Sequence, residues 1–247
     1  MATGPWLSTV LNKRGIPVPA IVMGGRGKAW KVLFVLMLSC LCAGTPAFAE
    51  KISLRWAILA DSTEGMRALD FSGSPIVFSG TALQLYIEHL NNCHVYLFLL
   101  DSSNRLTPIY PPQKGYYDYG FPRGPKLVPP GDQSFTFVPP AGTETMFLLA
   151  SAERLFQLDE LTEIFTQNPD QAGQQKLVLQ EIDDMLGGEE DQSRAAEKLE
   201  KVVVKYSGAD GIKERKFLAV KVGSSDFYGR KLLFDHRCCT VVGARKL

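Results

Sequence analysis

The sequence predicts a mainly β protein: an antiparallel β-sandwich with a helical insertion. Three observations support this fold class. Short β-rich segments recur between residues 51 and 150, separated by Gly, Pro and Asn. One of these segments alternates apolar and polar side chains, as a half-buried strand does. Helical periodicity is confined to a region that begins at Ser151, and strand-like segments return after residue 200.

The sandwich body is expected to span residues 50–150. Its first strand is "KISLRWAILA", and Pro75 marks the edge of the second, "SPIVFSG". In "TALQLYIEHL", Leu83, Leu85 and Ile87 point to one face and the intervening residues to the other, which predicts a half-buried strand. Asn91-Asn92 then predicts a turn into the more deeply buried "CHVYLFLLD". The remaining predicted strands of the body are "RLTPIY", "SFTFV" and "TETMFLLA".

Residues 151–200 are expected to form an acidic helical arm and linker. Apolar residues at helical spacing predict a first helix, with Ser151 as its cap and Asn168-Pro169 as its end. A second helix is predicted over "QQKLVLQEIDDML", ended by Gly187-Gly188. Residues 201–247 then predict three strands that return to the sandwich, "KVVVKY", "KFLAVKV" and "FYGRKLLFDH".

The charge of the chain inverts near residue 200. Residues 157–200 contain twelve acidic and three basic residues, whereas residues 201–247 contain eleven basic and four acidic ones. Two interpretations are open. The two regions dock on one another, or the basic C-terminal region makes a peripheral contact with anionic lipid or a partner protein.

The N-terminal region has the layout of a cleavable secretory signal. Residues 1–49 contain five basic and no acidic residues, and an apolar run is followed by a small-residue site that ends at Ala49. Cleavage is predicted between Ala49 and Glu50, with Met23 as an alternative start. The protein is therefore expected in the periplasm or cell envelope. A retained anchor helix and lipidation at Cys40 are the alternatives.

Export affects the interpretation of the cysteines, because the periplasm permits disulfides. After cleavage, Cys93 has Cys238 or Cys239 as its candidate partner. The simpler interpretation is that Cys93 is a small, buried apolar residue. His89 and His94 flank the predicted Asn-Asn turn, which brings them near one another.

No motif in the chain predicts catalysis. The sequence contains no Gly-x-Ser-x-Gly elbow and no glycine-rich phosphate or dinucleotide loop. His236 and the cysteines after it lack the spacing of a known zinc site. Removal of residues 1–49 changes the formal net charge from +1 to −4, which argues against nucleic-acid binding. We therefore expect no enzyme activity, cofactor, metal or nucleic-acid partner.

Residues 71–155 carry motifs of a known family. The stretch "YLFLLDSSNRLTPIYPP" and the later "VPP" and "PPAGTE" follow the family's order of turn and core residues. The matching positions are Tyr96, Leu97, Phe98, Asp101, Leu106, Ile109, Tyr110, Pro111, Val128, Pro129, Pro140, Gly142 and Glu144. The segment resembles the domain of unknown function family four-three-eight-four, with Asn104 in place of a turn glycine. The resemblance implies a β-sandwich module of exported or envelope-associated bacterial proteins, without an established activity.

A loop rich in tyrosine, proline and glycine follows "IYPP". Aromatic rings in a long loop bind a glycan, a peptide or a partner protein, or they pack over their own sheet. The predicted binding residues are Tyr110, Tyr116, Tyr117, Tyr119, Phe121, Arg123 and Lys126. We therefore expect a non-catalytic binding or assembly module with a protein or glycan partner in the envelope. A periplasmic hydrolase or sugar-processing enzyme, and a structural subunit of an envelope complex, are the alternatives.

Overall fold

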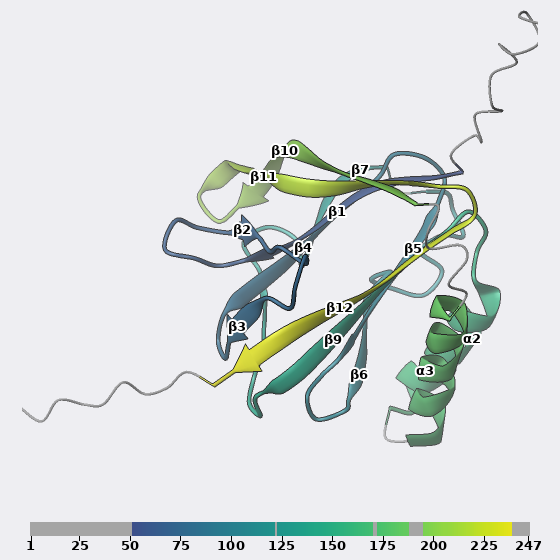
Figure 1. Cartoon of the computed structure of the whole chain (residues 1–247). Helices are drawn as coiled ribbons and strands as arrows, with labels where there is room; N and C mark the ends of the chain where they lie inside the picture. The colour runs from purple at the N-terminus through teal and green to yellow at the C-terminus, as the bar shows by residue number, and fades with distance from the viewer. Residues whose placement is uncertain (1–50, 122, 170–171, 188–194, 239–247) are drawn as a thin grey trace, which may run out of the picture. The chain divides into compact units, whose positions relative to one another are not determined.

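The computed structural model describes residues 51–121, 123–169, 172–187 and 195–238 (Figure 1). These residues belong to one compact unit, Phe48–Leu247. The predicted cleavage site at Ala49 and Glu50, the alternative start at Met23 and the lipidation candidate Cys40 lie outside the described residues. The predicted fold class is confirmed: the chain forms two packed, mostly antiparallel sheets and two helices.

The first sheet has seven strands. They are β1 (Ile52–Ala60), β2 (Arg67–Ala68), β4 (Ala82–His89), β7 (Gly124–Val128), β8 (Phe135–Thr136), β10 (Ala196–Gly208) and β11 (Gly211–Ser224). Their order is β10-β11-β1-β4-β7, with β2 paired to β1 and β8 paired to β4. The N-terminal and C-terminal parts of the chain therefore meet in one sheet, because β1 pairs with β11.

The second sheet has five strands in the order β3-β12-β9-β5-β6. They are β3 (Ile76–Phe78), β5 (His94–Leu100), β6 (Leu106–Tyr110), β9 (Gly142–Ser151) and β12 (Phe227–Arg237). The long pair β9–β12 is antiparallel, and the short β3 pairs parallel to the end of β12. The C-terminal strands thus return to both sheets, as the sequence predicts.

The two sheets share a core of alternating apolar residues. Leu54, Trp56 and Ile58 of β1 belong to the same buried cluster as Leu148 and Tyr228 of the other sheet. The Trp56 indole donates a hydrogen bond to the Tyr228 hydroxyl at 3.2 Å. The period-two pattern of the strands therefore places one apolar face of each sheet against the other.

β4 is buried on both faces, which corrects the prediction of a half-buried strand. The hairpin of β10 and β11 leaves β1 after Trp56 and covers the second face of β4. Tyr86 packs edge-on against Phe217, with 5.0 Å between ring centroids. The Gln84 amide donates to three backbone carbonyls of residues 129–133 at 2.7–3.0 Å, and its oxygen accepts from Arg215. Residues distant in sequence therefore satisfy this buried amide.

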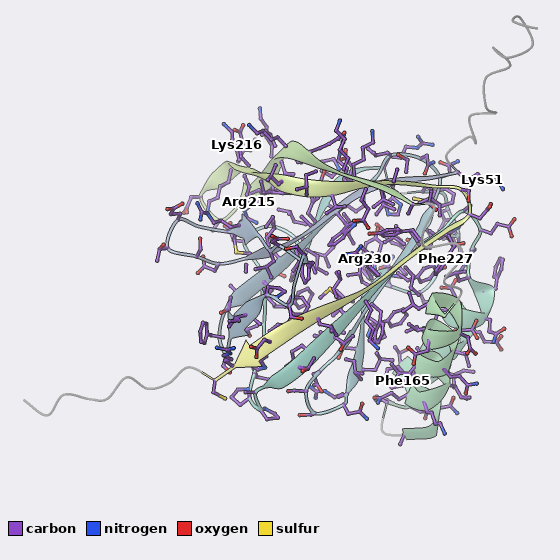
Figure 2. The ribbon with its side chains drawn as sticks, viewed as in Figure 1. Lys51, Phe165, Arg215, Lys216, Phe227 and Arg230 are labelled. Atoms are coloured by element: carbon purple, nitrogen blue, oxygen red, sulfur yellow. The ribbon has the colours of Figure 1, made fainter. Side chains whose placement is uncertain are left out.

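The helices α2 (Phe156–Gln167) and α3 (Ala172–Leu186) pack against the five-stranded sheet (Figure 1). Their buried residues are Leu158, Phe165 (labelled in Figure 2), Val178 and Ile182, which share the core cluster of the sheets. A Cβ on Gly229 of β12 would lie 2.4 Å from a terminal methyl group of Leu186, so a larger residue would require the Leu186 side chain to move. The predicted arm is thus part of the body. Neither described helix has the length and apolar character needed to cross a membrane.

Two predicted boundaries are wrong. Ser151 is not a helix cap but the last residue of β9, where it pairs with both neighbouring strands. α2 begins at Phe156, and the Tyr96 hydroxyl accepts a hydrogen bond from the Leu155 N–H at 3.2 Å in place of a side-chain cap. β10 begins at Ala196, inside the predicted linker. In both cases sheet pairing outweighs the local preference of the sequence.

Candidate ligand-binding cavity

The aromatic loop, residues 111–123, connects β6 to β7 and is anchored on β5. The Tyr117 hydroxyl donates to the Val95 carbonyl and accepts from the Val95 N–H, both at 2.8 Å. β6 pairs with β5 only from Leu97 onward, so Tyr117 satisfies backbone groups that the sheet leaves open. The rings of His94 and Phe121 lie 4.9 and 5.9 Å from the Tyr117 ring. One tyrosine therefore fixes the centre of the loop.

Burial separates the predicted binding residues. Tyr110 and Tyr117 belong to the core, although both also line the cavity described below. Their rings are buried because each hydroxyl has a partner inside the protein. Tyr116 and Phe121 are half-buried and pack against the core, so each keeps one accessible side.

The other three predicted residues do not form a common site. Tyr119 is fully exposed at 100 %. Arg123 is exposed and donates to the Asn92 side chain at 2.5 Å. Lys126 is half-buried, and burial lowers its pKa. It lines a second hollow of about 490 Å³ between β7 and β10, which it shares with Tyr116 and Tyr206.

A cavity of about 610 Å³ lies between the aromatic loop and α2. Tyr110 and Tyr116 line it from the loop side, Tyr96 from β5, and Phe156 from the first turn of α2. Phe156 is 70 % exposed although it is a large apolar residue. The volume is that of a small-molecule or side-chain pocket, and the lining combines aromatic rings with polar and charged side chains. We call this the aromatic cavity.

Ion pairs hold the two sides of the aromatic cavity together. The Arg154 guanidinium contacts Asp159 of α2 at 2.5 Å and also pairs with Asp118 of the loop. These hydrogen bonds, first to Asp159 and then to Asp118, raise the pKa of Arg154, so it stays charged. Lys114 of the loop pairs with Glu163 of α2. The loop is therefore positioned against the helix before any ligand binds.

Two polar groups of the aromatic cavity lack a partner within the described part of the chain. The Thr162 hydroxyl is buried and makes no hydrogen bond there. Glu160 is exposed at the rim and makes no ion pair with a described residue. A buried unpaired hydroxyl costs about 1–3 kcal/mol. The cavity therefore presents ring faces and the exposed Glu160 carboxylate to a ligand, whereas the Thr162 hydroxyl oxygen is itself buried.

A chain of hydrogen bonds connects the aromatic cavity to a buried histidine. His89 contacts the Cys93 carbonyl through Nδ1 at 2.9 Å and the Tyr110 hydroxyl through Nε2 at 3.0 Å. The Tyr110 and Tyr116 hydroxyls lie 2.8 Å apart. Burial lowers the pKa of His89 to about 4, so the ring is neutral at physiological pH. Because a carbonyl only accepts, the proton lies on Nδ1 and Nε2 accepts from Tyr110.

The loop and its flanking strands carry the positions of the family resemblance. Asn104 has φ of 60°, the left-handed conformation for which a turn glycine is usual. Pro111 and Pro129 follow the ends of β6 and β7, and Glu144 is buried in β9. Residues 77–154 match the domain of unknown function DUF4384. No curated protein and no solved structure matches the chain.

The DUF4384 segment supplies only part of the aromatic cavity. It extends from β3 to Arg154 and includes the whole aromatic loop, whereas α2 lies beyond its end. Sequence reasoning found the loop from its composition but missed Arg154, Phe156 and Thr162. The signal that could have indicated Phe156 is its position outside the apolar face of the predicted helix. This signal is weak, because single exposed apolar residues are common on protein surfaces.

A second buried cluster has the hydrogen-bond pattern of a hydrolase triad, Ser79–His236–Glu144, which the sequence did not reveal. His236 contacts Glu144 through Nδ1 at 2.7 Å and the Ser79 hydroxyl through Nε2 at 2.8 Å. However, the N–H groups of residues 79–81 donate to backbone carbonyls at 2.9–3.0 Å, so they are not available to stabilise an oxyanion. Neither cavity described above includes these residues. Glu144 and His236 are buried and satisfied by this cluster, whereas Ser79 is half-buried.

The cysteines are free where the structure describes them, which corrects the Cys93–Cys238 pairing. Cys93 precedes β5 next to the Ser151 end of β9, whereas Cys238 follows β12 beyond the Gly142 end. The length of β9 separates these ends by roughly 30 Å, far beyond disulfide reach. Burial raises the pKa of the Cys93 thiol to about 11. Cys239 lies outside the described residues.

No cluster of three metal-binding side chains occurs among the residues that the structure describes. His89 and His94 do approach one another, as the turn predicts, but the Tyr117 ring lies in contact with both. The candidate site is therefore the aromatic cavity, built by a loop from the DUF4384 segment and a helix that follows it.

Proposed function

We propose that this protein is an exported, non-catalytic binding or assembly module of the bacterial periplasm or cell envelope. Its aromatic cavity would hold part of a protein or glycan partner. The observation that carries the proposal is this cavity, with tyrosine rings of β5, β6 and the loop on one side and Phe156 and Glu160 of α2 on the other. Tyr117 and the Arg154 ion pairs hold the loop in place, so little entropy is lost on binding.

The chemistry of the aromatic cavity fits a partner with apolar faces and hydrogen-bonding edges. The rings of Tyr116 and Phe156 offer faces on which a sugar or a proline ring can stack. Glu160 offers an exposed carboxylate at the rim. Sugars and extended peptides both combine these properties, whereas a nucleic acid would meet four carboxylates of the lining, at Asp118, Asp159, Glu160 and Glu163.

The proposed location rests on the first 49 residues of the sequence. They combine basic residues, an apolar run and the Ala47-Phe48-Ala49 site, which is the order of a cleavable signal. Amino-terminal sequencing of protein from a periplasmic extract is expected to begin at Glu50. A start upstream of the apolar run would favour a retained anchor, and a lipid-modified Cys40 would favour a lipoprotein.

In-cell photocrosslinking tests the binding function. A benzoylphenylalanine residue replaces Phe156, which lines the aromatic cavity, and a matched variant carries it at Phe78. Phe78 is also an exposed phenylalanine, but it lies on β3 at the opposite edge of the five-stranded sheet from β6. We expect a discrete adduct from position 156 and none from position 78. The mass of the adduct separates a protein from a glycan.

The alternatives give different results in the same experiment. A structural subunit with a broad interface would form adducts at both positions, which would remove the special role of the aromatic cavity. A hydrolase or sugar-processing enzyme would give no stable adduct at Phe156 and would release products from oligosaccharides or esters. Loss of that release in Ser79→Ala would assign catalysis to the buried cluster and reject the binding proposal.

A further inference from the structure

The hairpin of β10 and β11 has one face that no residue described by the structure covers. The register pairs Val203 with Lys216 and Lys201 with Leu218 on this face. The opposite face, with Val204 and Phe217, is buried in the second core cluster. The hairpin therefore has an inner face that packs on β4 and a free face, which Figure 1 shows at the edge of the seven-stranded sheet.

Apolar residues are unusually exposed on the free face. Leu199 is 62 % exposed, Val203 52 %, Ile212 82 % and Leu218 46 %. All four are aliphatic residues of two paired strands, and three of them, Leu199, Val203 and Leu218, lie on neighbouring or diagonal positions. Single exposed aliphatic residues need no explanation, but a group of this size on one strand pair indicates an interaction surface.

Lysines alternate with these aliphatic residues. Lys201, Lys205 and Lys216 share the free face, on which Glu214 is the acidic residue near the turn. Glu214 pairs with Lys216 at 3.1 Å, whereas Lys201 and Lys205 make no ion pair with any residue that the structure describes. Figure 2 labels Lys216, which belongs to the outer half of the hairpin. The free face thus carries a net positive charge in addition to its aliphatic side chains.

We propose that the free face of the β10–β11 hairpin docks on the surface of an anionic lipid bilayer. A bilayer interface accepts this mixture, because aliphatic tips enter the apolar region while the lysines extend to the lipid phosphates. Protein interfaces are instead depleted of lysine at their centre and concentrate apolar residues there. On the free face the lysines lie between the aliphatic residues, which favours lipid over a protein partner. This inference does not depend on the aromatic cavity.

Vesicle sedimentation tests the inference. The chain from Glu50 onward contains every described element and both core clusters, so it is used without the apolar N-terminal run. The probes are vesicles of phosphatidylcholine alone and vesicles with an equal part of phosphatidylglycerol. We expect binding to the anionic vesicles only, and weaker binding as salt is added. Equal sedimentation with both vesicle types would overturn the inference.

Charge-neutralised variants locate the contact. Each lysine near an anionic surface contributes about a fivefold gain in binding, so K201Q/K205Q/K216Q is expected to bind roughly a hundredfold more weakly. The matched control is R105Q/R123Q/K176Q, which removes three exposed cations outside the hairpin. Its binding is expected to change little. If the control loses as much as the hairpin variant, the attraction is a property of net charge and the inference is wrong.

An aliphatic variant separates docking on lipid from attraction to any polyanion. L199S/I212S keeps all charges and is expected to reduce vesicle binding about tenfold, because both side chains are exposed and available for burial. Unchanged binding would contradict the inference. A benzoylphenylalanine at Ile212 that captures one protein in cells, from a chain that does not bind the vesicles, would assign the face to a protein and overturn it as well.

Discussion

His89 and His236 are both buried imidazoles in strands that face the core, yet they have opposite surroundings. His236 contacts the Glu144 carboxylate and the Ser79 hydroxyl. His89 contacts two neutral oxygens, the Cys93 carbonyl and the Tyr110 hydroxyl, and the Cys93 sulfur lies 3.9 Å from its Nδ1. One histidine therefore has an anionic partner inside the protein, whereas the other has none in hydrogen-bond contact.

The comparison shows that the accessibility of a cluster to a ligand has to be considered together with the chemistry of its residues. The His236 cluster has the partners of a catalytic triad, but backbone hydrogen bonds occupy the N–H groups around Ser79. The nucleophile of the His89 chain is the buried Cys93 thiol, whose pKa burial raises, and the chain ends at Tyr116, whose ring lines the aromatic cavity. The first cluster joins β3, β9 and β12, and the second supports the side of a cavity. The proposed binding function rests on the second.

The largest effect is expected where the anionic partner is removed. Glu144→Ala leaves His236 Nδ1 and the Ser102 N–H without their buried acceptor, because Glu144 accepts from both at 2.7 and 3.0 Å. We expect the free energy of unfolding in urea to fall by about 3–5 kcal/mol. Glu160→Ala, an exposed carboxylate of α2, is the control and is expected to change it by less than about 0.5 kcal/mol. Similar decreases in the free energy of unfolding of both variants would show that the Glu144 hydrogen bonds do not specifically stabilise the fold.

The neutral surroundings of His89 predict a dependence of stability on pH. Burial lowers the pKa of His89 from 6.5 to about 4. Between these values the unfolded chain binds a proton that the folded chain does not, so stability falls as pH decreases and levels off below about 4. The loss is about 3 kcal/mol over this window. In urea unfolding, His89→Asn is expected to reduce the slope of the free energy of unfolding against pH. The slope that remains comes from His94, because burial also lowers the pKa of His94. An unchanged slope would assign the pH dependence to other groups.

The anchor of the aromatic loop is expected to have a smaller effect. Tyr117→Phe leaves both the N–H and the carbonyl of Val95 without a partner, which costs about 1–3 kcal/mol by thermal or urea unfolding. Tyr119→Phe is the matched control, because Tyr119 is two residues away and fully exposed. It is expected to have no measurable effect. A loss of stability in Tyr119→Phe as large as in Tyr117→Phe would mean that the loop packs differently.

Sequence reasoning predicts the strands of the DUF4384 segment well because their signals are local. Asn91-Asn92 and Asn104 mark turns by their own conformational preferences, and the structure places turns there. The alternation in β4 predicts a strand but not its burial on both faces, because the cover comes from Phe217 and its neighbours more than one hundred residues later. Local pattern identifies the element, and distant residues decide its environment.

The aromatic cavity shows the same limit. Composition indicates the loop, but Tyr110 and Tyr117 are buried because their hydroxyls find partners on β4 and β5, which no spacing in the loop reveals. The periodicity of α2 predicts which side is buried, yet not that Phe156 and Thr162 face the loop. The Ser79–Glu144–His236 cluster joins three strands that adjoin only after the sheet forms. Sites of this kind can be predicted only when the fold is known.

The smallest effect is expected at Thr162, which lines the aromatic cavity. Thr162→Val replaces a buried hydroxyl that has no partner among the described residues with a methyl group, so it is expected to stabilise the free protein by about 1 kcal/mol. The matched control is Thr166→Val on the same helix, whose hydroxyl donates to the Glu163 carbonyl at 2.9 Å and which is expected to lose about 0.5–1 kcal/mol. Thermal unfolding compares the two. Because the hydroxyl oxygen is buried, the photocrosslinked adduct from position 156 is expected to keep its yield in Thr162→Val. A lower yield would mean that the partner reaches this hydroxyl and that the helix rearranges on binding.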